Sequence, residues 1–146
     1  MVRQQAAAPT LSRQQMDALV DGHFRAEEAR DLQAITEGFT QDAEHTVAGR
    51  PGGPLHGHDE IGAYHGALLT ALPITRLEPV RRWYGEDHVV DESILHATAV
   101  GEVFGFDGRG RPVRSGLLHV FDFAHGLICR ESAWLDLASI QRQLSS

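Results

Sequence analysis

His119 and Glu131 are the first candidates for chemistry in this 146-residue chain. His119 alternates with Leu117 and Phe121 in an apolar run, which is typical of one face of a strand. Glu131 follows in the next apolar run, after a turn at residues 124–126, so the two side chains could meet across a hairpin. An imidazole titrates near neutral pH and a carboxylate can fix its tautomer, so this pair suits general acid/base catalysis. The alternative for His119 is a core histidine bonded to a backbone carbonyl, and the alternative for Glu131 is a pair with an arginine such as Arg130 or Arg114.

Three further polar residues stand within apolar patterns. Glu92 shares a strand face with two aliphatic residues, where loss of water would raise its pKa and make it a proton acceptor. If that face is open, Glu92 belongs instead to an exposed row or a dimer contact. His45 lies in a short strand pattern and His65 on an apolar helical stripe. We predict that both histidines bind substrate oxygen, while strand exposure for His45 and helix packing for His65 are the alternatives.

Aromatic residues adjoin these candidates. Tyr64 precedes His65 on the helical stripe, and it is predicted to contact the same substrate. Phe121 and Trp134 are predicted to form an aromatic wall for a planar substrate, although aromatic side chains are equally normal in a core.

The segment His56-Gly57-His58-Asp59 contains good metal-binding groups. However, no third histidine follows at a known spacing, and the segment belongs to a loop rich in Gly and Pro. The sequence therefore predicts no metal site and no cofactor.

The elements that must position these residues follow from periodicity, caps and turns. Ser12 and Gln15 form a capping-box pattern before an apolar helical stripe, and Pro79 places its strand at a sheet edge. Helices preceding a meandering sheet indicate an α+β domain. The expected elements are a helix from Ser12, a helix over 31–38, a strand over 43–49, a helix capped by Asp59 and ending before Pro73, strands over 74–84, 88–104, 113–124 and 127–135, and a last helix capped by Asp136.

Composition narrows the class of protein. Hydrophobic residues make up 42% and charged residues 23%, which fits one domain at residues 12–146 after a loose tail at residues 1–11. The net charge of −7 without a basic run argues against nucleic acid as a partner. Cys129 is the only cysteine, so no disulfide can form within the chain, and no apolar run has the length of a membrane span. We expect a soluble, cytoplasmic protein with no membrane partner.

The element order and the last hairpin resemble the SnoaL-like family of the nuclear transport factor 2 (NTF2)-like superfamily, over residues 16–144. The residues that carry the resemblance are His119, Phe121, Gly126, Ile128, Glu131, Trp134, Asp136 and Gln143-Leu144. The resemblance implies a cone-shaped, curved antiparallel sheet wrapped around N-terminal helices. It also implies an internal apolar pocket for a small-molecule ligand, commonly in a homodimer.

Members of this superfamily include polyketide cyclases, ketosteroid isomerases, epoxide hydrolases, dehydratases and non-catalytic proteins, so the fold does not fix the reaction. His119 stands where SnoaL-like cyclases tend to carry an acid/base Asp. Our leading hypothesis is a cofactor-independent enzyme that uses His119, with Glu131 or Glu92, on a small to medium apolar, carbonyl-bearing or polyketide-like substrate. The alternatives are a non-catalytic ligand-binding or accessory protein, and a structural dimer module whose pocket is filled by its own side chains.

Overall fold

The computed structural model describes residues 10–145, so most of the predicted tail lies outside the described residues. The elements are α1 (Arg13–Ala29), α2 (Leu32–Glu37), β1 (Phe39–Val47), β2 (Leu55–His56), α3 (Gly57–Ala71), β3 (Ile74–Tyr84), β4 (His88–Ala99), β5 (Glu102–Val103), β6 (Phe106–Asp107), β7 (Arg111–Ala124), β8 (Leu127–Leu135) and α4 (Leu137–Ser145). This order confirms the predicted α+β class. None of the helices within residues 10–145 is long and apolar enough to cross a membrane.

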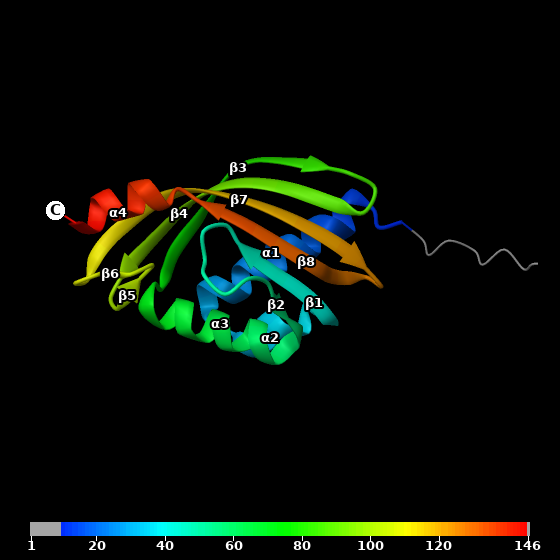
Figure 1. Ribbon diagram of the computed structural model, residues 1–146. Helices are drawn as coiled ribbons and strands as arrows, with labels where there is room; N and C mark the ends of the chain where they lie inside the picture. The colour runs from blue at the N-terminus through cyan, green and yellow to red at the C-terminus, as the bar shows by residue number, and fades with distance from the viewer. Residues whose placement is uncertain (1–9, 146) are drawn as a thin grey trace, which may run out of the picture.

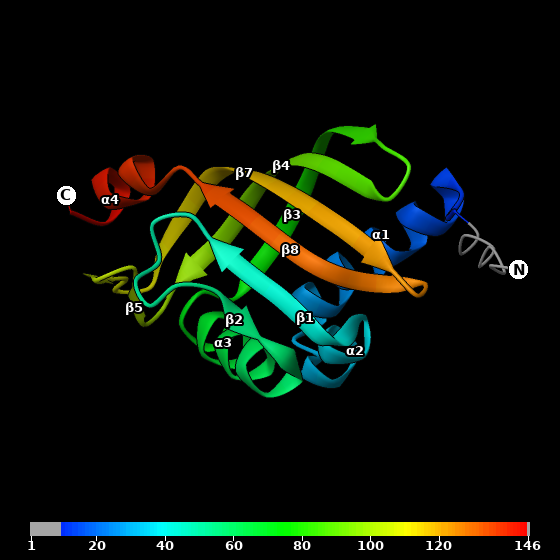
Figure 2. The ribbon, with the colours of Figure 1, turned by 45° about the vertical axis from the view of Figure 1, so that its right-hand side comes forward.

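A curved sheet covers the first three helices (Figure 1). Within the described residues its strand order is β2-β1-β8-β7-β4-β3, and β5 pairs with β6 in a separate small hairpin. Neighbouring strands run antiparallel except β1 and β8, which are parallel and lie side by side in Figure 2. The strand that contains Pro79 is at the edge of the sheet, as predicted.

Strict alternation of buried and half-exposed residues sets the inner face of the sheet. In β4 the buried positions include Asp91 and Ser93, and in β7 they include Leu117, His119 and Phe121. Successive side chains of a strand point to opposite faces, so all five lie on the side covered by the helices. The predicted row around His119 is therefore part of the enclosed face.

Three of the four predicted helix starts agree with the structure, including that of α4, where Asp136 Oδ1 accepts a hydrogen bond from the Ser139 N–H at 3.0 Å. Ser12 Oγ accepts a hydrogen bond from the Gln15 backbone N–H at 3.1 Å, and the Ser12 N–H donates to Gln15 Oε1 at 2.8 Å. Asp31 caps α2 by accepting from the Ala34 N–H at 3.1 Å. Asp59, in contrast, does not cap α3, which already begins at Gly57. It lies in the first turn, where a negative charge still favours the helix dipole.

Two strand boundaries differ from the prediction by more than two residues. β1 starts at Phe39 rather than at residue 43, so Phe39 belongs to the sheet and not to the preceding helix. β4 ends at Ala99 instead of continuing to residue 104. Its continuation is diverted because the N–H groups of Val100 and Gly101 both donate to the Ala71 carbonyl, at 2.9 and 3.1 Å. The chain then forms the β5–β6 hairpin beside the end of α3.

Gly108 ends the segment in which the chain leaves β4 and forms the β5–β6 hairpin. Replacing this glycine tests how the segment packs against β4. An added Cβ at Gly108 would collide with the carbonyl group of Ala99, whereas one at Gly116 meets no atom within 4 Å. We expect Gly108→Ala to lower the free energy of unfolding by about 1–3 kcal/mol, because backbone atoms cannot give way as a flexible side chain can. Urea denaturation of G108A beside the control G116A measures the difference. Equal stability of the two variants would contradict the assigned packing.

Candidate functional site

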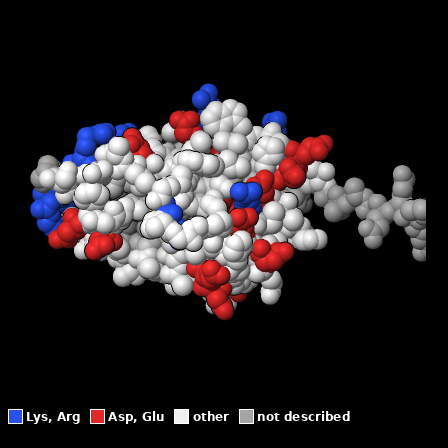
Figure 3. All heavy atoms as spheres, viewed as in Figure 1, with Lys and Arg blue, Asp and Glu red and all other residues white. Residues whose placement is uncertain are grey.

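The charged groups of the candidate site are buried and separate from the surface charges. In the view of Figure 3, acidic side chains gather below the sheet around α2, and basic side chains gather at the end that carries α4. The site lies instead in a narrow cavity of about 50 Å³ between α3 and the inner face of the sheet. Its apolar walls include Val47, Leu68, Leu72, Leu95 and Leu117, and its polar lining comprises Glu27, His45, Tyr64, His65, His119 and Glu131.

Glu131 is the centre of the polar cluster. Its Oε1 atom lies 3.2 Å from His23 Nε2, to which it is hydrogen-bonded, and 3.3 Å from His119 Nε2. Its Oε2 atom lies 2.9 Å from His45 Nε2. These contacts join β8 to α1, β7 and β1, and each of the four side chains is at most 5% exposed. One buried carboxylate therefore fixes three imidazole rings.

A second carboxylate extends the cluster towards α3. Glu27 Oε1 lies 2.6 Å from His23 Nε2 and 3.6 Å from His65 Nε2. His65 Nδ1 is 2.9 Å from the Ile61 carbonyl oxygen, one helical turn earlier. Because a carbonyl oxygen only accepts, this contact places a proton on Nδ1. The Nε2 atom of His65 consequently faces the two carboxylates.

Burial and neighbouring charges shift the pKa values of these groups in opposite directions. Burial alone would lower the pKa of His23, but the charges of Glu131 and Glu27 raise it to about 10. Burial would raise the pKa of Glu27, yet the charge on His23 lowers it to about 2. The pKa of Glu131 is held well below its ordinary range by His23 and His45, against the effect of burial. Both carboxylates are therefore ionised at neutral pH.

Two neighbouring groups respond to the same charges. Burial lowers the pKa of His65, but its contact with Glu27 and the charge of Glu131 raise it above the ordinary value. The pKa of Tyr64 is raised, first by burial and then by Glu131 and Glu27. Tyr64, which lines the cavity, therefore keeps its proton and is neutral.

The structure brings together most of the residues that the sequence singled out. His119 and Glu131 meet across the β7–β8 hairpin, and His45, Tyr64 and His65 line the same cavity. Two residues of the cluster, His23 and Glu27, were missed as site residues. Their signal was a histidine and a glutamate four residues apart on one helix, with His23 on the apolar face of α1.

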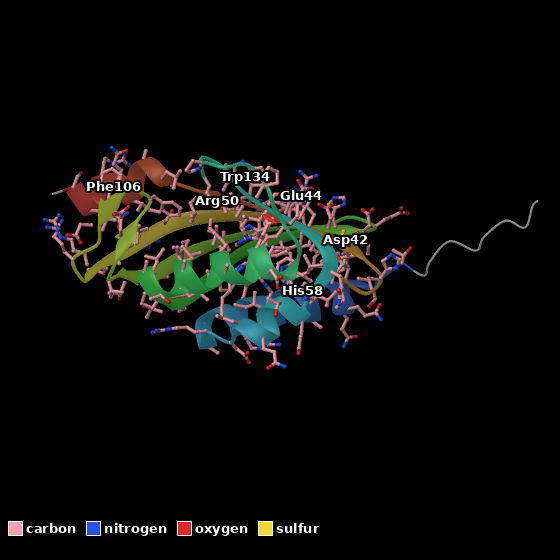
Figure 4. All side chains as sticks on the ribbon, turned by 60° about the horizontal axis from the view of Figure 1, so that its bottom comes forward. Asp42, Glu44, Arg50, His58, Phe106 and Trp134 are labelled. Carbon is pink, nitrogen blue, oxygen red and sulfur yellow. The ribbon has the colours of Figure 1, made fainter. Side chains whose placement is uncertain are left out.

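Glu92 and Trp134 do not reach the site, and both predictions need correction. Glu92 lies on the outer face of β4, where its side chain is 40% exposed and 3.8 Å from Arg81. The neighbouring positions Asp91 and Ser93 take the inner face, so alternation excludes Glu92 from it. Trp134 is 45% exposed and lies on the side of the sheet away from α3 in Figure 4.

Phe121 packs against His119 but is not part of the cavity wall. Its ring is fully buried and stacks on the His119 ring, with a centroid distance of 5.0 Å and an interplanar angle of 21°. The predicted aromatic wall of Phe121 and Trp134 is therefore wrong, because the two rings lie on opposite faces of the sheet. The role of Phe121 is to fix the plane of the His119 ring.

The segment at residues 56–59 does not gather its polar groups around one point. His56 is exposed, whereas His58 contacts the Phe39 carbonyl oxygen at 2.9 Å through Nε2. His58 therefore connects the start of α3 to β1.

Comparisons with known proteins agree with this fold. A family model described as a SnoaL-like domain matches residues 20–131. None of the curated proteins matches the sequence significantly. Because the matched segment contains both carboxylates and all four histidines of the cluster, the site lies within the family domain.

Solved structures with similar folds come from several bacteria. A candidate SnoaL-like polyketide cyclase from Jannaschia sp. CCS1 has a TM-score of 0.82 at 18% identity, with 98% of this chain and 99% of that chain covered. A candidate polyketide cyclase from Xanthomonas campestris has a TM-score of 0.81 at 19% identity, with coverage of 91% and 98%. An LEH-like epoxide hydrolase from M. tuberculosis has a TM-score of 0.71 at 12% identity, with coverage of 90% for each chain. At these identities the likeness concerns the fold.

Proposed function

The chain belongs to the SnoaL-like domain family, and from this premise we propose that it is an enzyme that transfers protons on a small, apolar, carbonyl-bearing substrate. The reaction would be of the cyclase, isomerase, hydrolase or dehydratase type. His119 is the proposed proton carrier, and Glu131 holds its ring in place. Among the similar structures, one is described as an epoxide hydrolase and others as candidate polyketide cyclases, which supports this range of reactions.

One observation carries the proposal: an imidazole held by a buried carboxylate lines a cavity that combines aliphatic walls with a cluster of polar groups. His119 Nε2 lies 3.3 Å from Glu131 Oε1, and both residues line the cavity. Glu131 is a weak base because its pKa is held well below the ordinary range by His23 and His45, against the effect of burial. The imidazole is therefore the better proton carrier of the pair, and the carboxylate orients and stabilises it.

The cavity favours the small end of the predicted substrate range. Its volume of about 50 Å³ admits only a few non-hydrogen atoms without movement of the walls. Its walls are largely aliphatic, so an apolar body would fit with a polar atom directed at the cluster. His45 and His65 are the proposed contacts for that polar atom, together with the hydroxyl group of Tyr64.

A non-catalytic ligand-binding protein is the second candidate. The observation that favours it is the crowding around the carboxylate, because three imidazoles already lie within 3.3 Å of Glu131. Such a network can exist to hold α1 against the sheet. A third reading, in which the pocket is filled by the chain's own side chains, is not favoured because His119 lines an open cavity.

Native mass spectrometry of the purified protein, followed by extraction of small molecules, separates the first two candidates. We expect a co-purified apolar compound or, in assays with epoxide, ketosteroid and polyketide panels, turnover of at least one member. A compound recovered unchanged after long incubation, with no turnover in any panel, would favour the binding protein and contradict the enzyme.

We also propose that the outer face of the sheet forms a homodimer. Trp134 pairs with Leu118 across β8 and β7, and Leu118 pairs with Glu92 on β4. Trp134 on β8 and Trp83 on the edge strand β3 are 45% and 41% exposed, which is unusual for such large apolar rings. An interface on this face would account for the positions of Trp134 and Glu92, which do not line the cavity.

Trp134→Asp tests the homodimer. A carboxylate at the centre of an apolar contact would lose its water on association, so we expect the variant to sediment as a monomer at concentrations where the parent is a dimer. Analytical ultracentrifugation measures the change, with Val100→Asp as control because Val100 is exposed beyond the end of β4. A monomeric parent, or an unchanged dimer in W134D, would contradict this interface.

A further inference from the structure

We propose that His23, Glu27, His65 and Glu131 together bind one divalent first-row transition metal ion. This inference goes beyond the proposed proton transfer, which needs no metal. One nitrogen or oxygen atom from each residue lies within 4.8 Å of the others, and all four residues are buried. They come from α1, α3 and β8, so only the folded chain assembles them.

The distances between the four groups approach those of a coordination sphere. Metal–ligand bonds of about 2.0–2.2 Å place neighbouring ligand atoms of a tetrahedral site roughly 3.3 Å apart. His23 Nε2 is 3.2 Å from Glu131 Oε1, and His65 Nε2 is 3.6 Å from Glu27 Oε1. His65 Nε2 is 4.0 Å from Glu131 Oε2. His23 Nε2 and Glu27 Oε1 are closer, at 2.6 Å, so a bound cation would replace the proton between them and move these two atoms apart by about 0.7 Å.

His65 has the hydrogen bond expected of a metal ligand. Its Nδ1–H donates to the Ile61 carbonyl oxygen at 2.9 Å, which leaves Nε2 to face Glu27 and Glu131. Histidine ligands of metals usually donate their second ring N–H to a carbonyl or carboxylate in this way, because the contact fixes both tautomer and ring orientation.

Glu131 offers an open acceptor at the same point. Among the described residues its buried Oε2 atom accepts no hydrogen bond, although His45 Nε2 lies 2.9 Å away. A buried carboxylate oxygen without a donor is costly and requires a partner. A metal ion among the four ligands would provide that partner.

Charge and donor type select the class of ion. Glu27 and Glu131 bring two negative charges into a buried site, and one divalent cation would balance both of them once His23 has lost its proton, as a metal-bound imidazole must. Imidazole nitrogen combined with carboxylate oxygen suits Zn²⁺ and the neighbouring transition metals, whereas Ca²⁺ and Mg²⁺ prefer oxygen ligands alone. The mixed set of two nitrogens and two oxygens therefore favours the transition metals.

The position of the cluster indicates what such an ion could bind. Glu27, His65 and Glu131 line the cavity, so an ion held by them would be next to any molecule inside it. A carbonyl or hydroxyl oxygen is the group that this ion would attract. This last step alone depends on the proposed substrate class.

Metal binding can be tested on the full chain without any substrate. The protein is first stripped with a chelator, and Zn²⁺ is then added in equimolar amount before native mass spectrometry. Co²⁺ provides a second probe through its visible absorption, which reports the ligands directly. The variants are His65→Gln and Glu27→Gln, and the control is His56→Gln, which removes an exposed histidine from the segment at residues 56–59.

We expect one Zn²⁺ per chain in the parent and in H56Q, and binding weakened more than about tenfold in H65Q and E27Q. The absence of a one-to-one zinc complex in the parent would overturn the proposal, whatever the variants do. Equal affinity of the parent and both cluster variants would also overturn it, and loss in H56Q alone would assign the ion to the loop. Because no turnover is measured, failure here leaves the proposed proton transfer to its own experiment.

Discussion

Replacing Glu131 by Gln is expected to lower the free energy of unfolding by about 3–5 kcal/mol. Gln keeps the volume of the side chain but removes the charge that faces His23, His45 and His119 within 3.3 Å. The charge of Glu131 contributes to raising the pKa of His23 to about 10, against the effect of burial. The variant therefore leaves a buried imidazolium with Glu27 as its one remaining carboxylate partner within residues 10–145. Loss of one partner of a buried pair costs more than the pair contributes, because the other charge stays in the core.

Urea denaturation at pH 7, followed by circular dichroism on metal-stripped protein, measures this loss. The matched control is Glu92→Gln, which removes a carboxylate from a partly exposed contact with Arg81 at 3.8 Å. Surface pairs of this kind contribute little, so the control should change by less than about 0.5 kcal/mol. A loss below about 1 kcal/mol in E131Q would show that the cluster is indifferent to this charge and would remove Glu131 from its assigned role.

Replacing His119 by Asn is expected to slow the chemical step by about 10²–10⁴-fold while the fold is retained. Asn can still donate a hydrogen bond towards Glu131, but it cannot take up and release a proton near neutral pH. Stacking of His119 on Phe121 and its contact with Glu131 position the ring, so the variant mainly removes the transferable proton. Single-turnover kinetics with the substrate found in the panels measure the step separately from binding.

His96→Asn is the matched control for this experiment. His96 contacts Glu78 at 3.0 Å, so it also belongs to a histidine–carboxylate pair, but it lies on the outer face of β4 and is not part of the cavity. H96N should turn over at the parental rate. Parental turnover in H119N would show that His119 is not the proton carrier, and an equal loss in both variants would indicate a general effect on the fold.

Local patterns were sufficient for the hairpin and its main pair. The turn at residues 124–126 and the alternation around His119 predicted that His119 and Glu131 meet, and their Nε2 and Oε1 atoms are 3.3 Å apart. The caps at Ser12 and Asp136 were predicted for the same reason, because a cap is recognised within three or four residues of sequence. The family resemblance read from this hairpin is confirmed by the family match.

Patterns of this kind cannot say which face of a strand is enclosed. Alternation placed Glu92 with aliphatic neighbours, but those neighbours belong to the outer face of β4. The same limitation applied to Trp134, whose partner Leu118 is on the outer face of β7. The choice of face depends on where the helices pack, and no spacing within a strand contains that information.

The sequence by itself determined the long strands, the caps at Ser12 and Asp136 and the hairpin across which His119 and Glu131 could meet, because each depends on residues close together in the chain. Tertiary structure alone decided that His23 and Glu27 join them. His23 contacts Glu131 across a separation of 108 residues, and this contact exists only because α1 packs beneath the sheet. The cluster of two carboxylates and four histidines is thus a product of packing between distant elements, and it is the feature on which both the proposed catalysis and the proposed metal ion depend.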